Sequence, residues 1–310
     1  LHSLRHRQRQ MCIRDRNRKI DYKINENDTG KTVEGFLKEH GYTHQVLVRL
    51  KQTDHGILRN GIWAYTNERL CKDDLITVQI VENECSDNIA PVNLPLDIAY
   101  EDDDIIVINK PFDMPAHPSA GNHDNTLANA LMYYYGSQNK PFVYRCINRL
   151  DRDTTGLTIV AKHALAGGIL GNAVAKRAIH RTYYAVCSGC TPACMRISAP
   201  IARKDASTIE RCVDFKRGEN AVTDFIRIKY NPDNNLSLVK LRLLTGRTHQ
   251  IRVHMKYIGF PLIGDFLYNP DYTYISRQAL HSGRLVFTHP VTGQKMNLIS
   301  DIPSDMKSLF

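Results

Sequence analysis

The sequence contains no long apolar run, and none approaches the roughly 20 residues that a helix needs to cross a bilayer. It also has no apolar segment of the kind that directs secretion. These absences argue against a membrane partner, and we expect a cytoplasmic protein. The eight cysteines would then be reduced thiols and not a disulfide framework.

Motifs for cofactor chemistry are absent as well: there is no glycine-rich phosphate loop, dinucleotide fingerprint, His-Glu-x-x-His helix or serine elbow. The nearest approach to a metal motif is Cys187, Cys190 and Cys194, with Cys212 as a fourth ligand. Cys187, however, falls in an alternating run typical of a strand. We therefore expect no metal, and a reaction that needs no cofactor.

The formal net charge of +9 is distributed unevenly along the chain. Residues 1–19 hold seven cations against Asp15, a net charge of +6, and have almost no apolar periodicity. The rest of the chain keeps only +3, so the total charge is weak support for nucleic-acid binding. We exclude 1–19 from the fold as a disordered basic tail. Two interpretations of this tail are open, a flexible RNA-binding arm and a sequence artefact, and we favour the artefact.

The remaining pattern predicts two domains, as a length of 310 residues suggests. Helical spacing between Asp28 and Gly41, a hairpin turn at Asn60-Gly61 and a strand over 75–80 predict a small module at residues 20–82. Residues 83–91 have the composition of a linker. A larger domain should follow at 92–310.

The larger domain alternates strand patterns, at 105–108, 157–161 and 237–243, with a few helical stretches. This order predicts an α+β fold with a mixed, mainly antiparallel sheet. The helical stretch that starts near Leu165 contains three glycines, each costing about 1 kcal/mol relative to Ala. Such a helix must be held by packing.

Charged side chains crowd into residues 145–156, where Asp151 stands among several arginines. If the chain is extended there, Arg149 and Asp151 point to the same face. An Asp among arginines stays ionised at neutral pH and could serve as a nucleophile or base. On composition alone, an ordinary solvated salt-bridge turn is the better interpretation.

A second cluster, residues 245–254, gathers cations and hydrogen-bond donors beside apolar residues, which suits phosphate and base contacts. Its two histidines, His249 and His254, are five residues apart and do not share a helical face, so a metal pair is not expected. We expect both to be structural histidines with satisfied hydrogen bonds.

Taken together, these segments resemble the RluA-type family of pseudouridine synthases, and within it the RluC- and RluD-like members. The resemblance spans residues 92 to about 305 in the family's order. It is carried by Asn109-Lys110-Pro111 with His117-Pro118, Arg149 to Leu157, Arg181-Thr182-Tyr183, Leu244 to Arg252, Gly264 to Tyr268, Ala279-Leu280-His281 and Phe287 to Pro290. Residues 20–82 resemble, more loosely, the small α-L RNA-binding module that also occurs in a ribosomal small-subunit protein.

The resemblance implies an enzyme that isomerises uridine to pseudouridine in RNA, without a cofactor. It implies that Asp151 is the catalytic nucleophile, that Arg247 pairs with its carboxylate and that Tyr183 packs on the target base. Whether Asp151 attacks the ribose, adds to the uracil ring or removes a ribose proton stays open.

A stacked uridine cannot reach a buried carboxylate, so it must be flipped out of the RNA. The resemblance implies that Arg149 fills the vacated place, with Leu280 as the apolar floor of the pocket. Arg252, from the second cluster, is expected to bind substrate as well. Two residues depart from the family pattern, Asn148 in place of His and Thr155 in place of Ser, and both keep hydrogen-bonding ability.

For the substrate, large-subunit ribosomal RNA is the expectation and transfer RNA the alternative, for a protein that acts as a monomer. The competing function is a non-catalytic RNA-binding or ribosome-assembly factor, which would be expected to lose Asp151, Arg247 or Tyr183. A zinc-dependent deaminase is disfavoured, because no His-x-Glu accompanies a Pro-Cys-x-x-Cys segment.

Overall fold

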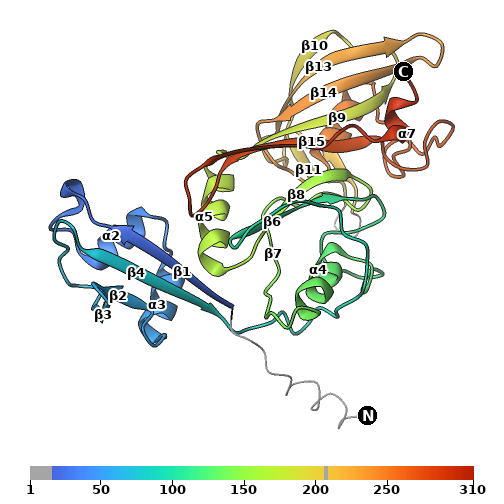
Figure 1. Cartoon of the computed structure of the whole chain (residues 1–310). Helices are drawn as coiled ribbons and strands as arrows, with labels where there is room; N and C mark the ends of the chain where they lie inside the picture. The colour runs from blue at the N-terminus through green and yellow to red at the C-terminus, as the bar shows by residue number, and fades with distance from the viewer. Residues whose placement is uncertain (1–15, 206–208) are drawn as a thin grey trace.

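The computed structural model describes residues 16–205 and 209–310 (Figure 1). The chain forms a small N-terminal module followed by a larger domain, each built on its own sheet. Strand β1 spans Arg16–Lys23, so the predicted tail boundary at residue 19 is wrong. Arg18 and its neighbours pair in the sheet of the module, and only residues 1–15 of the predicted tail lie outside the described part.

The module has a four-stranded sheet in the order β1-β4-β2-β3. Its elements are η2 (Glu26–Asp28), α2 (Val33–Glu39), α3 (His44–Gln52), β2 (Ile57–Arg59), β3 (Ile62–Trp63) and β4 (Leu75–Glu82). The Thr32 and Thr43 side chains cap the two α-helices by accepting backbone N–H groups. Asn60 and Gly61 both have positive φ, which makes the predicted tight turn between β2 and β3.

The larger domain is built on a ten-stranded sheet with a central path β10-β13-β14-β9-β15-β8-β6-β5, and β16 and β7 pair at its side. Only β15 and β8 pair in parallel, so the predicted mixed, mainly antiparallel sheet is confirmed within the described residues. The strands are β5 (Ile98–Glu101), β6 (Ile105–Lys110), β7 (Arg145–Cys146), β8 (Thr155–Ala161), β9 (His180–Ser188), β10 (Cys194–Ser198), β13 (Val222–Asn231), β14 (Leu236–Leu243), β15 (Leu280–Thr288) and β16 (Lys295–Ile299).

Helices cover parts of this sheet, and a small two-stranded sheet lies beside it. The helices are α4 (Leu127–Gly136), α5 (Ala164–Ala175), α6 (Gln250–Tyr257) and α7 (Ser304–Lys307), and the small sheet consists of β11 (Ile201–Arg203) and β12 (Arg211–Val213). In the described part of the chain, no helix is long and apolar enough to span a membrane.

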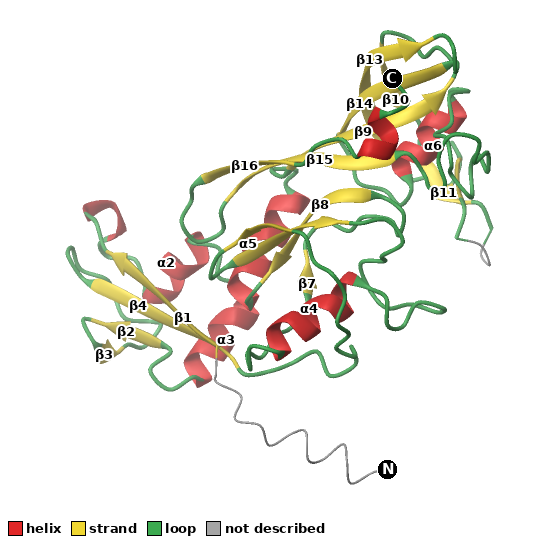
Figure 2. Cartoon of the chain, turned by 45° about the vertical axis from the view of Figure 1, so that its right-hand side comes forward, coloured by secondary structure: helices red, strands yellow, loops and turns green. Residues whose placement is uncertain are grey.

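Packing on two sides holds the glycine-rich helix α5, as its sequence requires. Leu165 belongs to the core of the module, whereas Ala166 and Leu170 belong to the core of the larger domain. A Cβ added at Gly168 would lie 3.0 Å from the Cγ2 of Thr43 in the module, so a small residue is needed there for close approach. The helix therefore joins the two domains (Figure 2).

Two ion pairs between the module and the larger domain flank this apolar contact. In one the module supplies the cation, and in the other it supplies the carboxylate. Arg18 of the module donates to both carboxylate oxygens of Asp104 in the larger domain, at 2.6 and 3.1 Å. Glu82 of the module accepts from Arg145 at 2.8 Å and from the backbone N–H of Ala164 at 2.7 Å. Both carboxylates are only 3% exposed. Buried pairs of this kind fix the orientation of the two domains more than they add stability.

Candidate active site

Asp151 lies in the loop between β7 and β8, and its side chain is 29% exposed. The loop turns back on itself, since the backbone N–H of Thr154 donates to the carbonyl of Asp151 at 3.1 Å. Asn148 holds the loop to strand β8. Its Nδ2 donates to the carbonyl of Leu157 at 3.2 Å, and its Oδ1 accepts from the N–H of Ile159 at 2.8 Å. The departure at Asn148 therefore keeps the loop attached to β8.

Lys110 ties the same loop to the preceding segment. Its ammonium group, 1% exposed, donates to the carbonyls of Pro111, Met114 and Arg152 at 2.7, 2.8 and 2.8 Å. Burial lowers the pKa of Lys110 to about 7, although the nearby carboxylates of Asp153 and Asp151 oppose this shift. The Asp151 loop is thus fixed at both of its ends.

Arg252, on α6, is the cation that pairs with Asp151. Its Nη1 donates to Oδ2 of Asp151 at 3.0 Å, while Nε and Nη2 each donate to Asp265 at 2.7 Å. The side chain is 1% exposed, and the rings of Phe266 and Tyr268 lie beside it. Burial alone would lower the pKa of Arg252, but the two carboxylates raise it above its ordinary value. Asp151 therefore faces a permanent, immobile positive charge.

The prediction that Arg247 makes this ion pair is wrong. Arg247 donates instead to the carboxylate of Glu219 and, at 3.2 Å, to the carbonyl of Asn220, and its side chain is 40% exposed. It precedes α6 on a surface loop, whereas Arg252 lies on the buried face of the helix. The motif from Leu244 to Arg252 contains both arginines. The position of Asp265, which binds Arg252, decides which of the two is held beside Asp151. Arg247 still lines the hollow beside Asp151.

The structure places Tyr183, Leu280 and Arg149 with Asp151 around one small hollow of about 90 Å³, which Arg252 also lines. Tyr183 on β9 and Leu280 at the start of β15 are each 4% exposed and belong to the same apolar cluster. Arg149 is exposed at the rim. A carboxylate, an aromatic ring and an apolar floor thus surround a space next to open solvent.

His249 also faces this hollow, contrary to the expectation that it is a structural histidine. It has left-handed backbone geometry (φ 55°) at the start of α6, and its Nε2 lies 4.0 Å from Oδ2 of Asp151. The Nδ1 of His249 is hydrogen-bonded to the Tyr268 hydroxyl at 2.9 Å, and this hydroxyl also accepts the N–H of Arg211 at 2.8 Å. The hydrogen bond at Nδ1 holds the ring with its Nε2 facing Asp151.

The charge state of His249 follows from its surroundings. Burial lowers its pKa, against the opposing effect of Asp151, so the ring is neutral at pH 7. No sequence pattern predicts this placement, because it depends on the positive φ of His249. His254 is fully buried and contacts the Thr223 hydroxyl and the Ala199 carbonyl, as expected of a structural histidine.

A wider cleft of about 1080 Å³ surrounds the hollow and is strongly basic. Among the described residues, Asp151 is the single acidic side chain that lines it. The arginines that line it come from separate segments and are Arg149, Arg152, Arg177, Arg181, Arg211, Arg242 and Arg247. Such a surface attracts a polyanion and presents one carboxylate to it.

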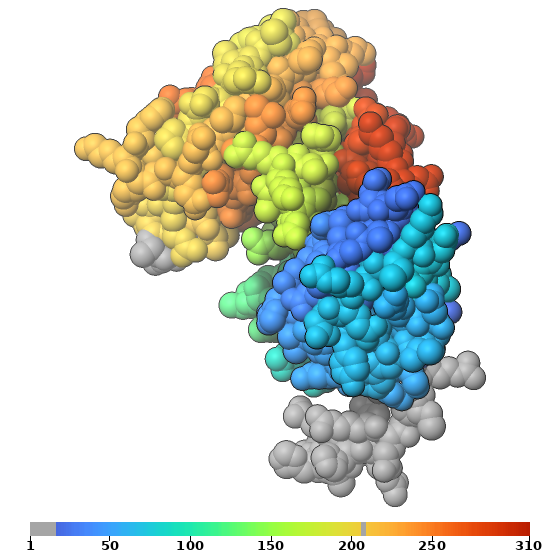
Figure 3. Space-filling view, turned by 90° about the vertical axis from the view of Figure 1, so that its left-hand side faces the viewer, coloured from blue at the N-terminus to red at the C-terminus, as the bar shows by residue number. Residues whose placement is uncertain are grey.

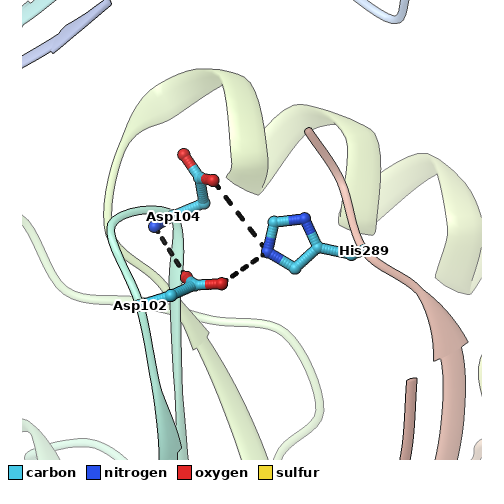
Figure 4. A group of neighbouring side chains, drawn as sticks. All are labelled: Asp102, Asp104 and His289. Carbon is cyan, nitrogen blue, oxygen red and sulfur yellow. Dashed lines mark hydrogen bonds and ion pairs between the residues drawn. The ribbon is translucent and has the colours of Figure 1, made fainter. Parts of the chain in front are cut away.

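A group of acidic side chains and a histidine that could hold a metal ion lies elsewhere, at the opposite end of β6 from Lys110. It comprises Asp102, Asp104 and His289 (Figure 4). The Nδ1 of His289 accepts the N–H groups of Val291 and Thr292, so the proton is on Nε2, which lies 2.8 Å from Asp102. A protonated nitrogen cannot bind a metal.

The two carboxylates of this group are also occupied. Asp102 accepts from the hydroxyl of Tyr100, and Asp104 accepts from Arg18 and His163. Although burial opposes it, these hydrogen bonds lower the pKa of Asp104 to about 2. We interpret the group as a hydrogen-bond network that supports the contact between the two domains.

The second departure from the family pattern, Thr155, keeps a hydrogen bond in the structure. Its hydroxyl donates to the Nδ1 of the buried residue His281 across 2.9 Å.

Burial lowers the pKa of His281 from 6.5 to about 4, so protonation of this ring favours the unfolded chain. As the pH falls from about 6.5 to about 4, this group should remove up to about 3 kcal/mol of stability. Urea unfolding at a series of pH values would measure the loss. A His281→Gln variant should lack that component, and parallel pH curves for the two proteins would contradict the prediction.

Known proteins resemble this chain over most of its length. Residues 104–257 match the RNA pseudouridylate synthase family, a segment that contains Asp151, Tyr183 and Arg252. The chain is 38% identical over 281 residues to the uncharacterized RNA pseudouridine synthase YjbO of Bacillus subtilis, covering 90% of this chain and 98% of that one. It is 41% identical over 245 residues to ribosomal large subunit pseudouridine synthase D of Haemophilus influenzae, covering 74% and 75%.

Among solved structures, human RNA pseudouridylate synthase domain containing 1 superposes with a TM-score of 0.57 at 26% identity, over 67% of this chain and 83% of that chain. The chain belongs to the RNA pseudouridylate synthase family. It is an isomerase that converts uridine in RNA to pseudouridine, as the sequence predicted.

Proposed function

We propose that this enzyme modifies specific uridines of large-subunit ribosomal RNA, with Asp151 as the catalytic carboxylate. The observation that carries the catalytic assignment is the single carboxylate of the basic cleft, held by the buried Arg252. The substrate assignment is supported by relatives from several bacteria whose names specify the large ribosomal subunit. A ribosomal substrate implies a cytoplasmic enzyme, and one chain supplies all the proposed catalytic residues, in keeping with a monomer.

The positions of the side chains support the remaining proposed roles. A flipped uracil enters the hollow beside Asp151, where Tyr183 packs on the base and Leu280 forms an apolar floor. Arg149, exposed at the rim, fills the space that the base leaves in the RNA. Arg252 pairs with Asp151 and orients it, Arg247 contacts the RNA backbone, and neutral His249 faces the reacting groups through its Nε2.

We also propose that residues 16–82 form an RNA-binding module of the α-L type. The loose resemblance of its sequence supports this, as does its sheet with the two short helices α2 and α3. Since the module is packed against α5, it would act together with the catalytic cleft and not as a separate tether.

Mapping pseudouridine in RNA from a strain that lacks the gene tests the proposed substrate. We expect specific sites in large-subunit ribosomal RNA to lose the modification and to regain it when the wild-type gene, but not an Asp151→Asn allele, is restored. Loss confined to transfer RNA would refute the ribosomal assignment while leaving the enzyme class intact.

A further inference from the structure

A second hollow, of about 950 Å³, lies where α3 of the module meets α5 of the catalytic domain. His44, Gln45 and Val48 line one wall, and Gly171 and Val174 line the other. Figure 2 shows α3 at the foot of α5, and in Figure 3 the yellow-green surface around α5 lies between the blue module and the orange strands. We call this hollow the α3–α5 groove.

The α3–α5 groove is continuous with the catalytic cleft. Cys146, Ile147 and Val174 line both of them. The two hollows therefore meet along the segment that leads into the Asp151 loop and at the C-terminal end of α5. An RNA that places a uridine beside Asp151 has a direct path into this groove.

The walls of the groove are fixed relative to the cleft. Arg145 lines the groove, is paired with Glu82 of the module, and its Cδ would lie 3.1 Å from a Cβ at Gly167. The Arg18–Asp104 pair and the buried Leu165 hold the same contact. The groove is thus part of the folded protein and requires no movement of the module.

The chemistry of the lining suits a nucleic-acid backbone. Among the described residues, no carboxylate lines the α3–α5 groove, whereas His44 and Arg49, which also pairs with Glu84 at 3.1 Å, line its module end. Arg177 and His180 line the adjoining part of the cleft. Gly171 leaves the backbone of α5 open to close approach, and Val48 and Val174 offer apolar surface to sugars and bases.

We propose that RNA flanking the target uridine runs from the Asp151 cleft into the α3–α5 groove and contacts the module and the catalytic domain together. The groove thereby selects RNAs that extend beyond the modified loop. This inference rests on the pseudouridine synthase activity and not on the choice of ribosomal RNA, because any RNA that wild-type enzyme modifies can be used to test it.

The test introduces a negative charge into the groove with Gly171→Glu and, separately, Val174→Glu. A Cβ at Gly171 meets no atom within 4 Å, and both positions are exposed, so the variants should fold. Asn172→Glu is the matched control, because Asn172 is exposed on the same helix but does not line the groove. Gly171→Gln separates the effect of charge from that of size.

The quantity to measure is kcat/KM for a long RNA that the wild-type enzyme modifies, divided by kcat/KM for a short hairpin with the same target uridine. We expect both groove variants to lower this ratio about fivefold, the effect of one charge that repels a phosphate at about 4 Å in water. Gly171→Gln should have a smaller effect, and Asn172→Glu should match wild type. An unchanged ratio in both groove variants would overturn the proposal.

A photoreactive side chain at position 171 then identifies the occupant directly. In the presence of the long RNA it should crosslink to nucleotides that flank the target. Crosslinks to a protein segment, or none to RNA while the enzyme turns over, would refute RNA as the occupant. If wild-type enzyme modifies transfer RNA instead, the ribosomal proposal fails, but the same comparison with long and short transfer-RNA substrates still tests the groove.

Discussion

Asp151→Asn is expected to abolish pseudouridine formation, with a loss of at least about a thousandfold in kcat. The amide has the same shape as the carboxylate and can still accept a hydrogen bond from Arg252, but it lacks the negative charge on which nucleophilic or base chemistry depends. Release of tritium from RNA labelled at carbon 5 of uracil measures the reaction, because this hydrogen leaves when the ring is rejoined through carbon 5.

The same variant should keep its fold and its affinity for RNA. The basic side chains of the cleft remain in place, and loss of a partly exposed carboxylate reduces the repulsion of phosphates. Binding of the substrate RNA should therefore equal or exceed that of wild type. Turnover close to the wild-type rate would show that Asp151 is not the catalytic group.

Arg252→Gln is expected to lower both stability and activity, since Arg252 is the counter-ion of two carboxylates. Asp265 is fully buried and would lose two charged hydrogen bonds, which typically costs about 3–5 kcal/mol. Asp151 would lose its fixed partner at the same time. Urea denaturation measures the first effect, and single-turnover kinetics of the folded fraction measures the second.

Two further variants make this prediction specific. Arg247→Gln removes an exposed pair with Glu219 and a hydrogen bond to the carbonyl of Asn220, and should cost less than about 1 kcal/mol of stability. The double variant Arg252→Gln/Asp265→Asn removes the buried charge together with its partner and should recover part of the lost stability, but not the activity. A larger loss of stability in Arg247→Gln than in Arg252→Gln would contradict the assignment of the ion pair.

Local pattern was enough to locate many of the elements. The strand patterns at 75–80 and 157–161 identified two strands, and Asn60-Gly61 identified the hairpin turn, because strand propensity and turn chemistry depend on neighbouring residues alone. The same reasoning wrongly assigned four residues of strand β1 to the tail. Arg16 to Lys19 look like tail by charge, yet they pair with β4, which is about 60 residues further along the chain.

Charge is the clearest case in which composition misled. Without residues 1–19 the chain is only modestly basic, which argued little for RNA binding. In the fold, arginines from several separate segments converge on one cleft, and the acids that balance them lie elsewhere. A net charge does not contain this information, because the electrostatic field at a site depends on distance.

The sequence by itself determined the family, the nature of the reaction and the position of Asp151, since motifs are local and ordered along the chain. Only the tertiary structure decided which arginine pairs with that carboxylate. Arg252 lies 101 residues from Asp151 in the chain and is selected because it is buried against Asp265, whereas Arg247 of the same motif faces solvent. The tertiary structure also decided how α5 joins the module to the catalytic cleft, because burial and ion pairing connect residues whose separation in the sequence predicts no contact.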